Sequence, residues 1–210
     1  MPTAEVRWFF DGPVPSEIEQ WFCRGGLLSA AAAREDFYLR FPASLGLNVK
    51  LREGRLEIKS LMTTLGSRRF APDAAGTVQL WEKRTGGDAA AAEFEWLRTS
   101  APDLWIAVRK GRTLRKFACN GEAIAEVDAG TVLPAEGCIA ELTKILVNGA
   151  DYWSFAFEAW GDPTQAEALL ARIAGHVLAD SHRPPRPFSA ADSHAYPDWL
   201  DGLIQADRAP

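Results

Sequence analysis

Residues 47–59, with the sequence LNVKLREGRLEIK, alternate strictly between apolar and polar side chains on both sides of a Glu53-Gly54 step. Because side chains of a strand point to alternate faces, this pattern predicts two strands joined by a two-residue hairpin turn. The facing polar pairs would be Arg52 with Arg55, Lys50 with Glu57, and Asn48 with Lys59. The hairpin is therefore expected to have one apolar and one charged face.

The charged face of this hairpin either meets solvent or lines a polar interior. Antiparallel sheets commonly wet one face, which accounts for the hairpin taken alone. The repulsive pair of Arg52 and Arg55 is better explained if an anion lies between the two guanidinium groups. The hairpin sequence leaves both interpretations open.

Charged residues recur in other predicted strands. The basic residues of segment 104–118 are Arg109, Lys110, Arg112, Arg115 and Lys116, and lone carboxylates stand among apolar neighbours at Glu5, Glu82, Glu141 and Glu158. Such charges face water or a polar cavity, because burial in a dry core carries a large desolvation penalty. If the strands close into a barrel, the charges form a polar lumen wrapped in apolar contacts to helices. An open sheet with its charged face in solvent gives the same pattern.

Strand and helix signals follow one another along the rest of the chain. Helices are expected after Ser16, over 30–35 (AAAARE), over 88–98 and after Asp162-Pro163. Residues 63–77 read as a polar bend, residues 103–121 as a long strand or a hairpin, and Asn148-Gly149 as a hairpin turn. Other strands are expected over 4–10, 36–41, 77–85, 122–130, 138–149 and 149–161.

These elements predict an α+β protein built on a closed or nearly closed antiparallel β-barrel, a tunnel of about eight strands with flanking helices. Residues 1–180 are expected to form the barrel domain, including the last of these helices. Residues 181–210 are expected to form a Pro-rich tail whose Tyr196, Trp199 and Leu200 dock on the barrel and whose end is disordered.

Composition narrows the class of partner and the location. A net charge of -5 over 210 residues argues against broad nucleic-acid binding, and no apolar run has the roughly 20 residues of a membrane span. The three cysteines have no metal-ligand spacing and read as free thiols in a reducing compartment. We therefore expect a cytoplasmic protein with no membrane and no nucleic-acid partner.

The order of these features resembles the CYTH superfamily, the triphosphate tunnel proteins. In that family an opening Glu-x-Glu-x-Lys strand is followed by an Asp-x-Tyr strand, a Leu-Arg-x-Arg hairpin, a later basic strand and a final acidic strand before a helix. Here DFYL resembles the Asp-Tyr strand, LNVKLREGRLEIK the hairpin, VRKGRTLRKF the basic strand and FAFEAWG the acidic strand. The similarity covers roughly residues 4–178.

The resemblance implies an anion site in the lumen and a metal site beside it. The cations expected to bind phosphate or another anion are Lys50, Arg52, Lys59, Lys110, Arg112, Arg115 and Lys116. The carboxylates expected to hold Mg2+ or Mn2+, or to orient the cations, are Glu5, Glu57, Glu141 and Glu158.

The opening strand departs from the family pattern at its metal ligands. EVRWF keeps Glu5, but Arg7 stands where the family has its second Glu and Phe9 where it has Lys. A guanidinium at a ligand position opposes a dication, so the catalytic metal site reads as degraded while the basic strands survive.

Three functions remain open from sequence. The first is a CYTH-like tunnel protein that binds a phosphorylated or other anionic small molecule, such as phosphate, triphosphate or a nucleotide-like compound, without fast turnover. The second is a metal-dependent triphosphatase or related phosphohydrolase whose carboxylates are rearranged, with Glu82 among them. The third is a non-catalytic scaffold that binds a protein partner through the aromatic segments around Trp153, Trp160 and Trp199.

Overall fold

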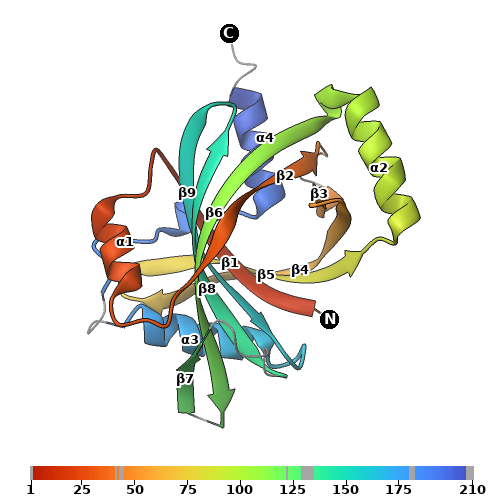
Figure 1. Cartoon of the computed structure of the whole chain (residues 1–210). Helices are drawn as coiled ribbons and strands as arrows, with labels where there is room; N and C mark the ends of the chain where they lie inside the picture. The colour runs from red at the N-terminus through yellow and green to blue at the C-terminus, as the bar shows by residue number, and fades with distance from the viewer. Residues whose placement is uncertain are drawn as a thin grey trace.

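The computed structural model describes residues 2–40, 42, 45–121, 123–128, 135–179 and 183–206. Within them, nine strands form one antiparallel sheet in the order β2-β3-β4-β5-β1-β9-β8-β6-β7. A further pairing of β2 with β6 closes eight of these strands into a barrel and leaves β7 outside it (Figure 1). The α+β class and the closed antiparallel barrel expected from sequence are therefore confirmed.

The strands are β1 (Pro2–Asp11), β2 (Ser29–Leu39), β3 (Leu47–Arg52), β4 (Arg55–Ala71), β5 (Ala74–Thr85), β6 (Trp105–Asn120), β7 (Ala123–Val127), β8 (Gly137–Val147) and β9 (Ala150–Trp160). The α-helices are α1 (Ser16–Cys23), α2 (Asp88–Ser100), α3 (Ala166–Val177) and α4 (Tyr196–Ala206), and short 3-10 turns span Pro102–Leu104 and Ala190–Asp192.

The β3–β4 hairpin has the register that its alternation predicts. Arg52 pairs with Arg55, Lys50 with Glu57 and Asn48 with Lys59. Glu53 and Gly54 have φ values of 48° and 72°, and positive φ at both central residues is the mark of a type I′ turn. The second predicted turn, at Asn148-Gly149, likewise has positive φ at both residues and joins β8 to β9.

Two elements differ from expectation because tertiary pairing overrides local sequence. The Ala-rich segment 30–35, expected to be helical, lies in strand β2 and pairs with β6, which closes the barrel. Residues 63–77, expected to be a polar bend, belong mostly to β4 and β5, which pair along their lengths with three register shifts. Such bulges let long strands carry polar residues and bend without breaking the ladder.

Apolar side chains cover the outside of the barrel wall, where helices pack on it. The largest core cluster joins alternate residues of β1 and β9, such as Trp8, Phe155 and Phe157, to the apolar faces of α1 and α3. A separate cluster packs Leu51 and Leu56 of the hairpin against α2, at the upper right of Figure 1. The apolar hairpin face is therefore buried under a helix, and the charged face turns inward.

The C-terminal helix closes one end of the lumen. Trp199 and Leu200 of α4 are 9% and 5% exposed and pack against Phe9, Ile106 and other apolar residues near one end of the barrel strands. Along their strands, these residues lie an even number of positions from charged residues that face inward, such as Arg7 and Lys110. They therefore point to the same inner face of the barrel. We call this cluster of α4 and the strand ends the apolar plug. The last four residues, where the sequence predicts disorder, lie outside the described part of the chain.

Replacing Leu200 with alanine is expected to lower the free energy of unfolding by about 2 kcal/mol, because it empties part of the apolar plug. Leu27→Ala, at a side chain 48% exposed, is the matched control and should change stability by less than about 0.5 kcal/mol. Urea denaturation measures both. Equal effects of the two substitutions would show that α4 is not docked in the barrel end.

None of the helices in the described part of the chain is long and apolar enough to cross a membrane. All three cysteines are free thiols, as expected.

Candidate functional site

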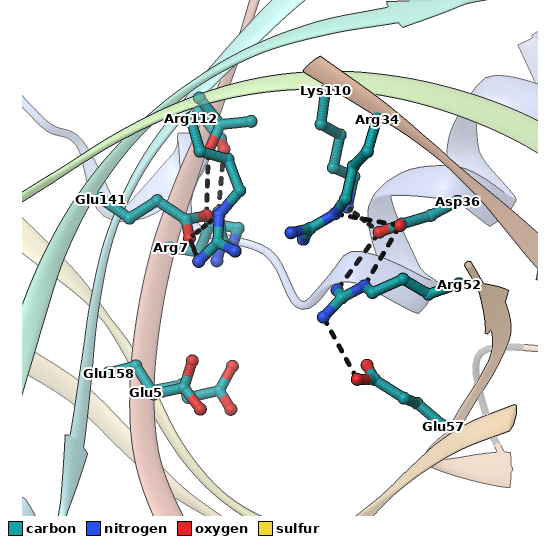
Figure 2. A network of polar contacts seen from close by, with 12 residues as sticks. Glu5, Arg7, Arg34, Asp36, Arg52, Glu57, Lys110, Arg112, Glu141 and Glu158 are labelled. Carbon is teal, nitrogen blue, oxygen red and sulfur yellow. Dashed lines mark hydrogen bonds and ion pairs between the residues drawn. The ribbon is translucent and has the colours of Figure 1, made fainter. Parts of the chain in front are cut away.

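A cavity of about 270 Å³ occupies the lumen beside the apolar plug, near the low end of the roughly 300–1,000 Å³ usual for small-molecule sites. Its walls come from β1 to β6, β8, β9 and the start of α4. Among the described residues, eight Arg or Lys side chains and four Glu side chains line it. Figure 2 shows the labelled members of this set, such as Arg34, Arg52 and Glu141, pointing toward a common space from opposite walls.

Glu141 of β8 is the centre of one charge cluster. Its carboxylate accepts hydrogen bonds from Arg7 Nη1 at 2.9 Å, Thr143 Oγ1 at 2.9 Å and Arg112 Nε at 2.6 Å. Arg7 also donates to Ser154 Oγ at 2.9 Å. Burial raises the pKa of Glu141, but the positive charges of Arg7 and Arg112 outweigh it and hold that pKa well below its usual value.

Asp36 of β2 is the centre of a second cluster on the opposite wall (Figure 2). The side chain is fully buried and accepts two bonds from Arg52, each 3.2 Å long, and one from Arg34 Nε at 3.1 Å. Burial raises the pKa of Asp36, but the charges of Lys110, Lys50 and Arg52 lower it to about 2. Asp36 is therefore a permanent anion that fixes the guanidinium groups around it.

Glu57, on the return strand of the hairpin, is shared by three cations. Its oxygens lie 2.8 Å from Lys83 Nζ, 3.1 Å from Lys50 Nζ and 3.2 Å from Arg52 Nη1. Burial raises the pKa of Glu57, but Lys50 and its other cationic neighbours lower it to about 2. Burial and the charge of Arg52 lower the pKa of Lys50 to about 8, although Glu57 and Asp36 favour its charged form.

Lys59 occupies the space between two facing carboxylates. Glu5 of β1 pairs in register with Glu158 of β9, and the Lys59 ammonium bonds to both, with 3.2 Å to Glu158 Oε1. Burial lowers the pKa of Lys59, but the two carboxylates outweigh it and raise the pKa above its ordinary value. The ammonium is thus an internal counter-ion to two facing carboxylates.

The four carboxylates predicted to be metal ligands each contact cationic side chains. No group of three or more His, Cys, Asp or Glu side chains in the described part of the chain is placed to hold a metal ion. Glu141, Glu57 and the Glu5–Glu158 pair each lie against their own cations, so a divalent ion would have to displace a bound guanidinium or ammonium group. The four predicted metal ligands all line the cavity, but as partners of cations.

Five of the seven cations expected at the anion site line the cavity: Lys50, Arg52, Lys59, Lys110 and Arg112. Arg115 does not, because it lies on the opposite face of β6 from Arg112 and forms an ion pair with Glu126 of β7. Lys116 does not line the cavity either. β2 pairs with β6 only as far as Leu114, so Lys116 lies beyond the point where the barrel closes.

The anion suggested between Arg52 and Arg55 is not needed to explain that pair. Arg52 is bound by Asp36 and Glu57, whereas Arg55 is exposed and lies outside the cavity.

The sequence analysis did not identify several lining residues: Arg7 (noted only as a departure from the family pattern), Arg34, Tyr38 and Tyr196 (expected only to dock on the barrel). Lys83 also lines the cavity, and its place there depends on strand register, which the sequence does not give. The spacing Arg34-x-Asp36-x-Tyr38 places three polar groups on one face of a strand and is a usable signal. It was hidden because the Ala-rich residues before it favour a helix.

No family model and no curated protein matches the chain. The structure of the PH1819 protein from Pyrococcus horikoshii OT3 is similar, with 10% sequence identity and a TM-score of 0.48 over 97% of this chain and 99% of that one. A conserved hypothetical protein from Pyrococcus furiosus (Pfu-838710-001) has 13% identity and a TM-score of 0.42 over 93% of this chain and 98% of its own. Neither name states an activity.

Stability is expected to fall as the pH is lowered from about 4.5 toward 2, because Glu57 must then be protonated. Its pKa is lowered from 4.5 to about 2 in the folded state, so its contribution is present above pH 4.5 and lost below it. At about 1.4 kcal/mol per pKa unit this amounts to about 3 kcal/mol. Glu57→Gln should be less stable at pH 7 and show a flatter acid profile in chemical denaturation. An acid profile as steep as that of the unsubstituted protein would contradict this assignment.

Proposed function

We propose that this protein binds a small anionic molecule, carrying phosphate or similar oxyanion groups, inside a CYTH-like barrel. The observation that carries the proposal is the excess of positive charge in a closed lumen. Cationic side chains outnumber carboxylates among the lining residues, and they still do when buried Asp36 is counted with the carboxylates. Partly desolvated cations in excess favour an anionic ligand, because Arg offers paired donors and Lys a point charge to its oxygens.

Binding without metal-dependent turnover fits the carboxylates better than hydrolysis does. Metal-assisted phosphoryl transfer needs a dication to neutralise developing charge, and each carboxylate here already neutralises a side chain. Glu82, a candidate ligand of the hydrolase alternative, pairs with Arg84, whose side chain is 73% exposed, and does not line the cavity.

The scaffold alternative loses its specific support. It depended on exposed aromatic side chains, but Trp153 and Trp199 are 1% and 9% exposed and Trp160 is partly buried. The Trp153 ring packs in the barrel wall and the Trp199 ring in the apolar plug.

A thermal-shift titration with phosphate, pyrophosphate and triphosphate tests the proposal. A ligand that binds only the folded state must raise the midpoint of unfolding as its concentration rises. We expect stabilisation at millimolar concentration that increases with the number of phosphate groups and does not require Mg2+. The absence of a shift with all three anions would refute anion binding.

Arg34→Gln is expected to weaken binding of the best of these anions by about 10- to 100-fold, the loss of one charge-assisted hydrogen bond. Arg34 bonds to Asp36 through Nε, and Figure 2 shows its outer nitrogens directed toward the cavity centre. Arg115→Gln is the matched control, since it removes the same charge from an arginine that also pairs with one carboxylate but lies outside the cavity. Calorimetric titration should leave its affinity within about twofold of the unsubstituted protein. Equal losses in both variants would mean that only the overall charge matters.

A further inference from the structure

Lys110 of β6 lies on the floor of the cavity, where the polar lumen meets the apolar plug. Two residues before it, Val108 is buried in the plug, and two residues after it, Arg112 reaches Glu141 in the charged part of the lumen. The whole residue is 5% exposed, yet it lines the cavity. Lys110 therefore has an apolar environment on one side and access to a bound ligand on the other.

Two tyrosine rings enclose the Lys110 amine. Its Nζ lies 3.7 Å from the centroid of the Tyr196 ring, 4.7 Å from that of Tyr38, and 2.5 Å from the Tyr38 hydroxyl. The two rings stack on each other at 5.1 Å with an interplanar angle of 4°. This enclosure leaves little room for the water that normally stabilises an ammonium ion, although the faces of the two rings themselves attract a cation.

The ion pair between Lys110 and Asp36 is long, although the charge of Lys110 helps to lower the pKa of Asp36. Asp36 Oδ2 lies 3.7 Å from Nζ, beyond hydrogen-bond length, and Asp36 is already bound by Arg34 and Arg52. The charged groups that act on Lys110 are Lys50, Asp36, Arg7 and Glu141, and the neighbouring hydroxyls are those of Tyr38 and Tyr196. Burial and the charge of Lys50 hold the pKa of Lys110 well below its ordinary value of 10.5.

Tyr38 is placed to support a neutral amine. Burial and the charge of Asp36 raise the pKa of the Tyr38 phenol, so its hydroxyl stays protonated. Lys110 Nζ donates to the Tyr38 hydroxyl oxygen, and once the amine is neutral the hydroxyl can donate to the nitrogen lone pair instead. Desolvation beside another cationic group is a known way to activate a lysine as a nucleophile. The sequence analysis counted Lys110 among the cations that bind the anion. Burial and the charge of Lys50 favour the uncharged form of its amine instead.

We propose that Lys110 is a nucleophilic amine that forms an imine with the carbonyl group of an anionic aldehyde or ketone held in this cavity. The inference rests on the proposed function, because the lumen cations would hold the anionic group of the ligand while its carbonyl carbon reaches Nζ. It narrows the ligand class from anions in general to anions that carry a reactive carbonyl.

Imine formation at Lys110 needs neither an oxidant nor a metal. The nitrogen lone pair attacks the carbonyl carbon, the carbonyl electron pair moves to oxygen, and proton transfer from nitrogen to that oxygen gives a neutral carbinolamine. Loss of the hydroxyl group and of the remaining N–H proton as water then leaves the C=N bond. The Tyr38 hydroxyl, 2.5 Å from Nζ, is positioned to relay these protons.

Reductive trapping with three related probes tests the proposal. Pyridoxal 5′-phosphate has both an aldehyde and a phosphate, pyridoxal has the aldehyde alone, and pyridoxine 5′-phosphate has the phosphate with an alcohol in place of the aldehyde. After borohydride reduction and peptide mapping, we expect pyridoxal 5′-phosphate to modify Lys110 about tenfold or more faster than Lys144, whose side chain is 64% exposed. Pyridoxal should react more slowly at Lys110, and pyridoxine 5′-phosphate should protect it.

Variants separate covalent capture from reversible binding. Lys110→Arg should abolish the adduct on this peptide, and pyridoxine 5′-phosphate should raise the unfolding temperature of the unsubstituted protein. Tyr38→Phe should slow trapping without removing the protection. Protection and stabilisation by pyridoxine 5′-phosphate without faster trapping at Lys110 would overturn the imine and leave anion binding intact. If neither phosphate probe binds, the proposed anion-binding function is itself refuted. If Lys110→Arg does not fold, peptide mapping of the reduced adduct on the unsubstituted protein still shows whether Lys110 is the residue that reacts.

Discussion

Glu141→Gln is expected to lower the free energy of unfolding by about 4 kcal/mol, the cost of leaving a buried charge without its partner. The carboxylate of Glu141 neutralises two guanidinium groups, those of Arg7 and Arg112, whose side chains are only 15% and 20% exposed. Glutamine keeps the shape and one acceptor but removes the charge, so two arginines would remain in the barrel wall without a counter-ion. Urea denaturation at pH 7 measures the loss.

Glu82→Gln is the control for this substitution. It removes the same charge from an ion pair with Arg84 at the surface, where such pairs contribute about 0–1 kcal/mol. Because the lumen of Glu141→Gln has a larger excess of positive charge, triphosphate should also stabilise it more than it stabilises the unsubstituted protein. Similar losses for Glu141→Gln and Glu82→Gln would contradict a desolvated charge network in the lumen.

Lys59→Met is expected to destabilise the protein by about 3 kcal/mol at pH 8, because Glu5 and Glu158 would then face each other without a cation. In the unsubstituted protein, burial raises the pKa of Glu158 but Lys59 outweighs it and lowers that pKa. Without Lys59 the pKa of Glu158 should rise above that of the unfolded chain. A group with a raised folded pKa favours folding at low pH, so the deficit should shrink as the pH is lowered from 8 to 5.

Divalent metal gives a second measurement on the same variant. If the Lys59 ammonium occupies the place of a cation, Mn2+ should raise the unfolding temperature of Lys59→Met and leave the unsubstituted protein unchanged. Lys83→Met removes a lysine whose side chain is 39% exposed and which pairs with Glu57, and serves as the control. A deficit that is independent of pH, together with equal effects of Mn2+ on all three proteins, would show that Lys59 has no such role.

The local sequence pattern was sufficient to predict the hairpin and its register, but not the ion pairs between strands that are distant in sequence. The register of Lys50 with Glu57 follows from strict alternation and a two-residue turn, both read within thirteen residues. The bond from Arg7 to Glu141 joins residues 134 positions apart and depends on the barrel register, which no local pattern contains. The sequence therefore identified most of the charged groups at the site but not the partners that hold them.

Two errors in the sequence analysis have the same physical origin. Alanine favours helix in isolation, yet residues 30–35 pair with β6 because closing the barrel satisfies their backbone groups. Arg115 was grouped with Lys110 because both lie in the segment that resembles the family's basic strand, although alternation along β6 places the two on opposite faces. In both cases the pairing and alternation of the sheet, and not the residue type, determined where the residues lie.

The most direct measurement of the central claim is the position of a bound oxyanion in a crystal soaked with tungstate, a tetrahedral anion with a strong anomalous signal. We expect an anomalous peak inside the barrel cavity, with oxygen atoms at hydrogen-bond length, about 2.7–3.2 Å, from Arg34 and at least one other lining cation. A peak confined to the outer surface, for example at Arg115 or Arg68, or an empty lumen at saturating tungstate, would contradict the anion site.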